Sequence, residues 1–457
     1  MSNSRVSEAS AVIDNPDRET ELLVAIAQRA LDRARAGGAH QVEVSVSSSL
    51  SREAGVRLGE VETLEEARDR GVRVTVYRDQ RNGTASTGDL DSEVIDECVD
   101  RALAIARHTQ PDKASGLADA AQMAADSPDL DLWHPHELAM PDLIERAVAI
   151  ERAGLDGDPR ISNSEGASVS SEATISVLAN SHGFFGISRG TRFSQSCVLI
   201  ASDEQGMQRD YDWDSARRFD RLAAPAVTGG EAARKTARRL GSKRVPTGPV
   251  PVLLVPDIAQ GLIGHLVSAV SGSSLYRRSS FLLDSLGEKL LPEWAALIER
   301  PRLSGASASA AFDSDGVATH ESPLIADGVL ARYVLSHYSA RRLGLETTAN
   351  AGGVRNLQWV GGGVSPEKLI EQMGRGLVVT EVMGQGVNLV TGDYSRGAAG
   401  FWVEDGAIAW PVEEITIAGH LRDLLAGIRA AGNDTDLRRS IQVPSLLLAE
   451  MMVAGQG

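Results

Sequence analysis

Cysteine is nearly absent from this sequence, since only Cys98 and Cys197 occur in 457 residues. A zinc site built on thiolates needs several closely spaced cysteines, and no CxxC pair exists here, so the count excludes one. Cys98 falls on the apolar stripe of an expected helix and Cys197 in an alternating strand. We therefore expect both thiols to be buried structural side chains, with no disulfide between them.

Long apolar runs and blocks of positive charge are also missing. No run approaches the roughly 18 to 20 apolar residues that a membrane span needs. The formal net charge is −16, and the most basic stretch, residues 234–244, is typical of the solvated face of a helix. The first twenty residues carry no signal-peptide pattern. The sequence therefore predicts a cytoplasmic protein that binds neither a membrane nor nucleic acid.

The common catalytic motifs do not occur either. His320-Glu321 is followed by Leu324 and Ile325, where a zinc-binding HExxH or HExxxH motif would place its second histidine. The nearest approach to Gly-x-Ser-x-Gly, at residues 392–397, has one residue too many before the serine. No phosphate-binding glycine loop is found. What remains is binding chemistry without an evident catalytic centre.

The hydrophobic periodicity predicts an α+β fold, in which an N-terminal α/β domain with an antiparallel sheet precedes a strand-rich C-terminal domain. Alternation at residues 42–46 and 72–76, the latter after a turn at Gly71, indicates two strands, with another antiparallel pair between residues 52 and 70. A hydroxyl-rich meander covers residues 161–211, and its Ser/Thr face should be solvated or line a groove. Helices are expected near residues 19–36, 92–108, 141–154 and 231–240.

Three prolines within residues 245–251 mark the expected domain boundary, because proline interrupts regular elements. Residues 1–18 are expected to be a disordered tail, residues 19–244 the N-terminal domain and residues 245–457 the C-terminal domain. In the C-terminal domain, helices are expected at residues 257–271, 339–343 and 366–373.

The segment from Thr380 to Gly406 concentrates glycine among hydroxyl, carboxylate and guanidinium side chains. Glycine lets another chain approach the backbone closely, so the segment suits the holding of a peptide or a partner. Arg396 could hold a carboxylate terminus and Asp393 an amide or amine, while an internal Asp393–Arg396 pair that braces a turn is the structural alternative. The candidate peptide- or partner-binding residues are Gly384, Gln385, Gly386, Asp393, Tyr394, Arg396 and His265, although a histidine at an apolar helix start, like His265, is more often a packed side chain.

The same segment carries a family resemblance. Residues 380–388 read TEVMGQGVN, residues 391–404 read TGDYSRGAAGFWVE and residues 411–419 read PVEEITIAG. Together with upstream stretches at residues 279–287, 312–317 and 338–345, they resemble the PmbA/TldE branch of the TldD/PmbA family (peptidase U62, modulator of DNA gyrase). The resemblance runs from about residue 20 to the end of the sequence.

The resemblance implies a division of labour between two subunits. In this family a TldD-type subunit holds zinc through an HExxxH helix and a distant cysteine, and it pairs with a PmbA/TldE-type subunit. Here the corresponding helix, near residues 256–261, has no histidine, and residues 440–445 have no cysteine. The resemblance therefore implies a chain with no catalytic residue, metal or cofactor of its own. Its expected partners are a zinc-bearing TldD-like subunit and unfolded or small peptides, and a homodimer is the form it could take alone.

Two other functions stay open at this point. The chain could be a self-sufficient peptide hydrolase that uses His265 with a carboxylate such as Asp257. It could also be a non-proteolytic, peptide-binding homodimer. Zinc bound by the isolated chain would favour the first of these, and a failure to associate with a TldD-like subunit would favour the second.

Overall fold

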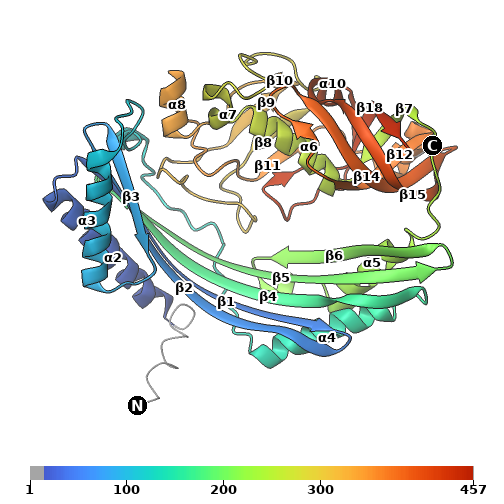
Figure 1. Cartoon of the computed structure of the whole chain (residues 1–457), viewed down its shortest axis with the longest axis horizontal. Helices are drawn as coiled ribbons and strands as arrows, with labels where there is room; N and C mark the ends of the chain where they lie inside the picture. The colour runs from blue at the N-terminus through green and yellow to red at the C-terminus, as the bar shows by residue number, and fades with distance from the viewer. Residues whose placement is uncertain (1–14, 456–457) are drawn as a thin grey trace.

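The computed structural model describes residues 15–455, and its N-terminal half is built on one long, curved antiparallel sheet (Figure 1). The strands lie in the order β3-β2-β1-β4-β5-β6. In β1, Val44 and Val46 are buried and alternate with the half-buried Ser45 and Ser47, so the sheet has an apolar face and a hydroxyl face. The strands are β1 (Gln41–Arg57), β2 (Glu60–Arg78), β3 (Arg81–Thr87), β4 (Ile161–Asn180), β5 (Phe185–Asp203) and β6 (Gly206–Ala216).

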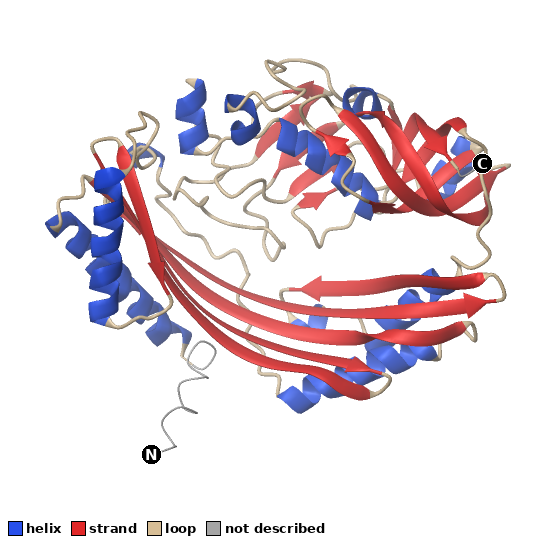
Figure 2. Ribbon diagram, viewed as in Figure 1, coloured by secondary structure: helices blue, strands red, loops and turns tan. Residues whose placement is uncertain are grey.

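Helices cover the apolar, convex face of this sheet (Figure 2). Helices α2 and α3 pack on one end of it and α4 and α5 on the other, each through a stripe of buried side chains at helical spacing. The hydroxyl face is left free of helices and faces the C-terminal region (Figure 1). The helices are α2 (Pro16–Ala36), α3 (Ser92–His108), α4 (Met140–Leu155) and α5 (Pro225–Ala237).

In the C-terminal region, strand pairing closes on itself. Strand β7 pairs in parallel with β12, which pairs antiparallel with β14, and β14, β15, β18 and β7 follow one another in antiparallel pairs. One apolar cluster, which contains the fully buried Trp402 and Ile263, joins this ring to helix α6. The elements are β7 (Gly248–Leu254), α6 (Pro256–Ala269), α9 (Pro366–Met373), β12 (Gly376–Met383), β13 (Val387–Asn388), β14 (Asp393–Glu404), β15 (Ala407–His420), α10 (Leu421–Ala426), β16 (Ile428–Ala431) and β18 (Leu446–Ala454).

A smaller sheet packs beside the ring, with its strands in the order β10-β9-β8-β11-β17. Its last strand comes from the C-terminal part of the chain and pairs in parallel with β11, so sequence-distant segments meet here. These elements are α7 (Gly272–Tyr276), β8 (Ala296–Glu299), β9 (Ser322–Ala326), β10 (Val329–Leu330), α8 (His337–Leu343), β11 (Leu357–Val360) and β17 (Ile441–Gln442).

The predicted fold class is confirmed, and the helices predicted at residues 92–108 and 366–373 have those bounds. The predicted burial of Cys98 and Cys197 as free thiols is also confirmed. Among the described residues, no helix combines the length and the apolarity that crossing a bilayer requires.

Along the first hairpin, the antiparallel pair predicted between residues 52 and 70 is confirmed, but the predicted turn at Gly71 is wrong. Gly71 lies inside β2 opposite Ser47, and β1 and β2 form one continuous hairpin that turns at Leu58 and Gly59. Most of residues 60–70 are exposed, so the apolar alternation lapses there although the strand continues. A strand exposed on both faces has no alternation of apolar and polar residues, so the sequence pattern does not reveal it.

Helix starts also differ from the prediction. Helix α2 begins at Pro16, earlier than Glu19, because the Asn15 side chain accepts a hydrogen bond from Arg18 N and proline suits the first helical position. Helix α5 begins at Pro225 and ends at Ala237, earlier than residues 231–240. Residues 1–14 of the predicted tail lie outside the described residues.

Candidate functional site

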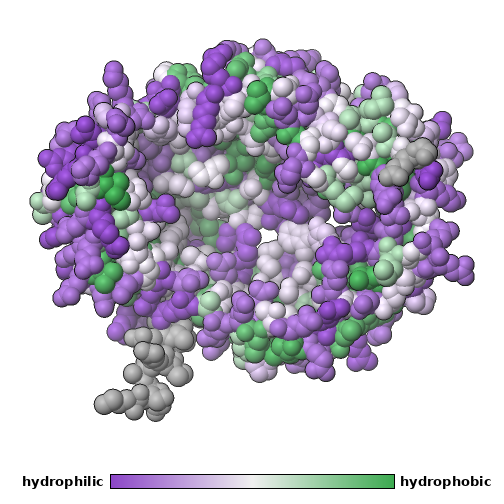
Figure 3. Space-filling view, in the orientation of Figure 1, coloured by the Kyte–Doolittle hydropathy of each residue, from purple (hydrophilic) through white to green (hydrophobic). Residues whose placement is uncertain are grey.

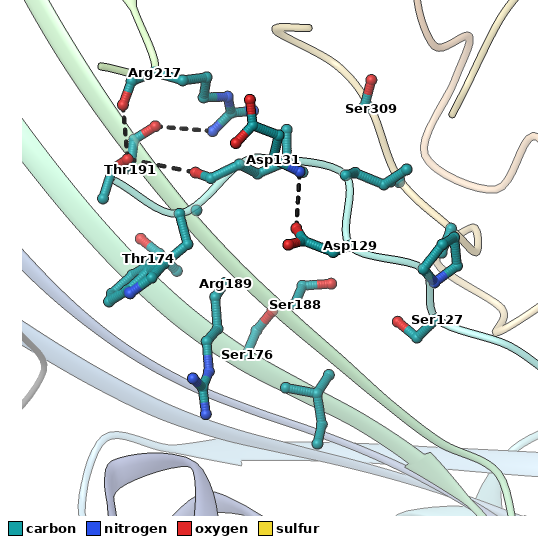
Figure 4. A pocket seen from close by; sticks show the side chains of 18 of the residues that line it. Ser127, Asp129, Asp131, Thr174, Ser176, Ser188, Arg189, Thr191, Arg217 and Ser309 are labelled. Carbon is teal, nitrogen blue, oxygen red and sulfur yellow. Dashed lines mark hydrogen bonds between the residues drawn. The ribbon is translucent and has the colours of Figure 1, made fainter. Parts of the chain in front are cut away.

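The hydroxyl face of the long sheet forms one wall of a cavity of about 840 Å³ (Figure 4). Strands β4 and β5 supply Thr174, Ser176 and Ser188 to this wall. The segment of residues 127–133 and the loop of residues 309–312 from the C-terminal region form the other walls of the cavity. The space-filling view shows the molecule hollowed between the sheet and the C-terminal region (Figure 3). Of the two alternatives for the Ser/Thr face, a solvated surface or the lining of a groove, the structure shows the groove.

Two smaller cavities adjoin the first along the same face. One, of about 200 Å³, lies over β1, β2 and β4 and is lined by Glu53, Glu65 and Ser170 among others. The other, of about 500 Å³, lies between β6 and the C-terminal region, where Trp213 faces Gln260 of α6. Arg192 of β5 lines all three cavities. We call these connected hollows the central groove.

The glycine-rich segment lies away from this groove, in β12, β13 and β14. A Cβ at Gly386 would lie 1.7 Å from the Ser395 carbonyl oxygen, because the backbones of the two residues are in direct contact. Ser395 N donates a hydrogen bond to Gly386 O at 2.6 Å. Gly386 is therefore required for close packing within the chain. Gly384 and Gln385 are exposed, and no atom would lie within 4 Å of a Cβ at Gly384.

Tyr394, His265 and Arg396 come together between β14 and α6. The Tyr394 ring is buried, and its edge meets the His265 ring at a centroid distance of 6.1 Å. Burial, and after it the charge of Arg396, lowers the pKa of His265, and burial raises the pKa of the Tyr394 hydroxyl. Both rings are therefore neutral near pH 7. The packed interpretation of His265 fits this environment.

Asp393 does not belong to that group, and the predicted Asp393–Arg396 pair is wrong. Asp393 accepts a hydrogen bond from the Thr391 hydroxyl at 2.6 Å, while Arg396 reaches the Val382 carbonyl at 3.5 Å. Successive side chains in a strand point to opposite faces of the sheet. Asp393 and Arg396 are three positions apart in β14, so they lie on opposite faces. The binding role of the predicted residues stays a prediction.

Helix α6 meets the segment of residues 436–442 at the end of the groove. Arg439 donates to the Asp257 carboxylate at 2.7 Å, so an ion pair joins the helix start to this segment. The side-chain oxygen of Gln260, one turn along the helix, is buried without a hydrogen-bond partner. No imidazole or thiolate lies at this junction, and residues 15–455 contain no group of three His, Cys, Asp or Glu side chains placed to hold a metal. The residues here do not fit a zinc ion.

The sequence did not predict that Arg192 and Arg217 face the central groove. The alternation of serine and threonine was the available signal for the wall of the groove. It carries no information about which C-terminal loop would cover that wall. The loop of residues 309–312 reaches it only through tertiary packing.

Comparison with known proteins agrees with this architecture. Family models described as PmbA/TldA metallopeptidase domain 1, central domain and C-terminal domain match residues 42–106, 133–240 and 247–455. The chain is 45% identical to metalloprotease PmbA of Escherichia coli O157:H7 over 98% of this chain and 99% of that protein. It is 43% identical to a metalloprotease PmbA homolog of Haemophilus influenzae over 96% of this chain and 97% of that protein.

Solved structures show the same fold. A Bacteroides thetaiotaomicron protein described as a modulator of DNA gyrase superposes with a TM-score of 0.90 at 29% identity, over 97% of this chain and all of that one. TldE of Thermococcus kodakarensis gives a TM-score of 0.83 at 20% identity, over 94% of this chain and all of that one. The fold is that of a metallopeptidase-family chain. The chain belongs to the PmbA/TldD (peptidase U62) family.

Proposed function

We propose that this chain is the metal-free, noncatalytic subunit of a TldD/TldE-type heterodimeric zinc metalloprotease that cleaves unfolded or small peptides. The main support for the proposal is the Asp257–Arg439 ion pair, which occupies the junction of α6 with residues 436–442. An aspartate already neutralised by a guanidinium is a poor metal ligand, and its neighbours Gln260 and Gly261 are no better. The zinc and the hydrolytic step then belong to the TldD-type partner.

The central groove supports the second half of the proposal, the handling of peptides. Its wall of hydroxyl groups can donate to and accept from peptide groups regardless of sequence. The Ser168 and Ser196 hydroxyls, for example, lie 3.0 Å apart on this face and bond to each other. Apolar side chains such as Ile187 and Phe312 line the same hollow. A mixed lining of this kind suits unfolded chains of varied sequence.

The proposal is tested by co-expression of this chain with a TldD-type subunit from the same organism. We expect the two to elute together on size-exclusion chromatography and to cleave an unstructured peptide in a chelator-sensitive manner, while this chain alone cleaves nothing. Chelator-sensitive cleavage by the isolated chain would contradict the proposal. Absence of a complex would favour a peptide-binding homodimer instead.

A self-sufficient hydrolase based on His265 and Asp257 finds little support in the geometry. The two residues are eight positions apart on α6, which is about 12 Å along a helix. Asp257 is engaged by Arg439, and the His265 ring packs against Tyr394. A general base needs its proton donor within hydrogen-bond reach, and these two side chains cannot act together.

A further inference from the structure

Two guanidinium groups without a carboxylate partner lie in the central groove. Arg217 is half-buried and donates to the Thr191 carbonyl at 3.1 Å (Figure 4). It also donates to the Ser307 carbonyl at 2.6 Å, while its Nε is buried with no hydrogen-bond partner among the described residues. Arg192 lines the same cavity from β5. Burial, and after it the charge of Arg192, lowers the pKa of Arg217, so the two cations are close enough to repel each other.

The other arginines of the groove are already neutralised. Arg438 makes two hydrogen bonds to the Asp436 carboxylate, at 2.9 and 3.0 Å, and Arg439 pairs with Asp257. Among residues 15–455, neither Arg192 nor Arg217 has an ion pair of this kind. Arg192 and Arg217 therefore carry the least compensated positive charge in the central groove. The chain as a whole has a net charge of −16.

The acidic side chains nearby are engaged elsewhere. Glu172 lies opposite Arg192 in the register of β4 and β5, but it accepts its hydrogen bond from the Thr174 hydroxyl at 3.2 Å. The Asp131 carboxylate lies 3.1 Å from His134 Nε2, and Asp129 accepts from Asp131 N. The charge of Glu172 acts on Arg217, but among the described residues no carboxylate forms an ion pair with either arginine, so both can still receive the carboxylate of a ligand.

We propose that Arg192 and Arg217 form a carboxylate-binding subsite of the central groove, which takes the C-terminal carboxylate or an acidic side chain of an extended peptide. The exposed Arg192 guanidinium presents parallel N–H donors that match a carboxylate. Arg217, which already donates to two carbonyls, adds its positive charge beside them. The cavity of about 840 Å³ has room for several residues of an extended chain. It lies between the sheet and the loop of residues 309–312, where a folded surface would not enter. The inference rests on the proposed peptide-handling function.

The test uses the isolated chain and isothermal titration calorimetry. Three N-acetylated peptides of alanine and serine are compared: one with a free C-terminal carboxylate, one with a C-terminal amide, and one amide with a central glutamate. We expect at least one carboxylate-bearing peptide to bind about tenfold more tightly than the plain amide, as charge-assisted hydrogen bonds allow. Which of the two does so identifies the source of the carboxylate.

Arg192→Ala is the informative variant, because Arg192 holds no structural hydrogen bond that the substitution would remove. It should abolish the preference for a carboxylate, whereas Arg221→Ala, at an exposed arginine outside the groove, should leave it unchanged. Arg217→Lys should weaken the preference, with thermal unfolding as a check on the fold.

Equal affinity for the three peptides, no detectable binding, or an unchanged preference in Arg192→Ala would overturn the subsite. The calorimeter contains only this chain and a peptide. The measured carboxylate preference therefore does not depend on whether the chain forms a heterodimer. A failure of the pairing experiment would leave the carboxylate preference intact, so the two proposals fail separately.

Discussion

Gly400 lies opposite Val379 in the antiparallel pairing of β14 with β12, beside a register irregularity. A Cβ at this position would lie 1.9 Å from the Val378 carbonyl oxygen, whereas at Gly397, on the same strand, it would lie 3.5 Å from the Met383 Cβ, an ordinary contact. We therefore expect Gly400→Ala to lower the free energy of unfolding by about 1 to 3 kcal/mol through overpacking, and Gly397→Ala by less. Urea denaturation of both variants measures the difference. Equal losses would show that the strand pair adapts, and the packing explanation would be wrong.

At the scale of the element, helix α4 holds the turn of the first hairpin. The buried Glu151 carboxylate accepts hydrogen bonds from Leu58 N at 2.8 Å and from Gly59 N at 2.9 Å. An amide can accept only one of them, and its NH₂ group would face a backbone N–H. We expect Glu151→Gln to cost roughly 1 to 3 kcal/mol in urea denaturation. Glu145→Gln, at an exposed position of the same helix, is the matched control and should cost almost nothing.

Elements with a buried face were predictable from the sequence, and contacts between distant segments were not. The valines of β1 and β2 display their period because helices cover them, while the exposed residues 60–70 display none. The glycine-rich segment was predicted as a binding surface, yet Gly386 and Gly400 serve contacts between strands. No local pattern specifies that Arg439 would reach Asp257, because the two are far apart in the chain.

At the scale of the whole molecule, an acidic cluster joins the long sheet to the C-terminal region. His337 lies 2.6 Å from Asp315 and donates to the Gly116 carbonyl at 2.5 Å. Burial, and then the nearby Asp315, raises the pKa of Glu43 to about 7, and burial likewise raises that of Asp313 to about 6. Burial alone would lower the pKa of His337, but the hydrogen bond to Asp315 and its charge outweigh it, so the pKa is raised.

The raised pKa values of Glu43, Asp313 and His337 all make the folded state less stable as the pH rises. A group whose pKa is raised in the folded state binds its proton more tightly there, so its stabilising effect is lost as the pH rises through the folded-state pKa. We expect the melting temperature to fall between about pH 5 and pH 8. Glu43→Gln, which keeps a neutral side chain, should melt higher than the parent near pH 8 and about equally near pH 5.

The control for this prediction is Glu60→Gln, at an exposed position of the same sheet. It should not change the pH profile. A Glu43→Gln variant that melts below the parent near pH 8 would show that Glu43 is stabilising as a carboxylate, contrary to its buried, acidic surroundings.

The central claim, that this chain supplies no metal centre of its own, is tested most directly by the zinc content of the isolated chain. The chain is purified without a partner, incubated with excess zinc, desalted and analysed by inductively coupled plasma mass spectrometry. We predict zinc far below one ion per chain, because Arg439 neutralises Asp257 and residues 15–455 place no imidazole or thiolate beside them. One firmly held zinc ion per chain would contradict it.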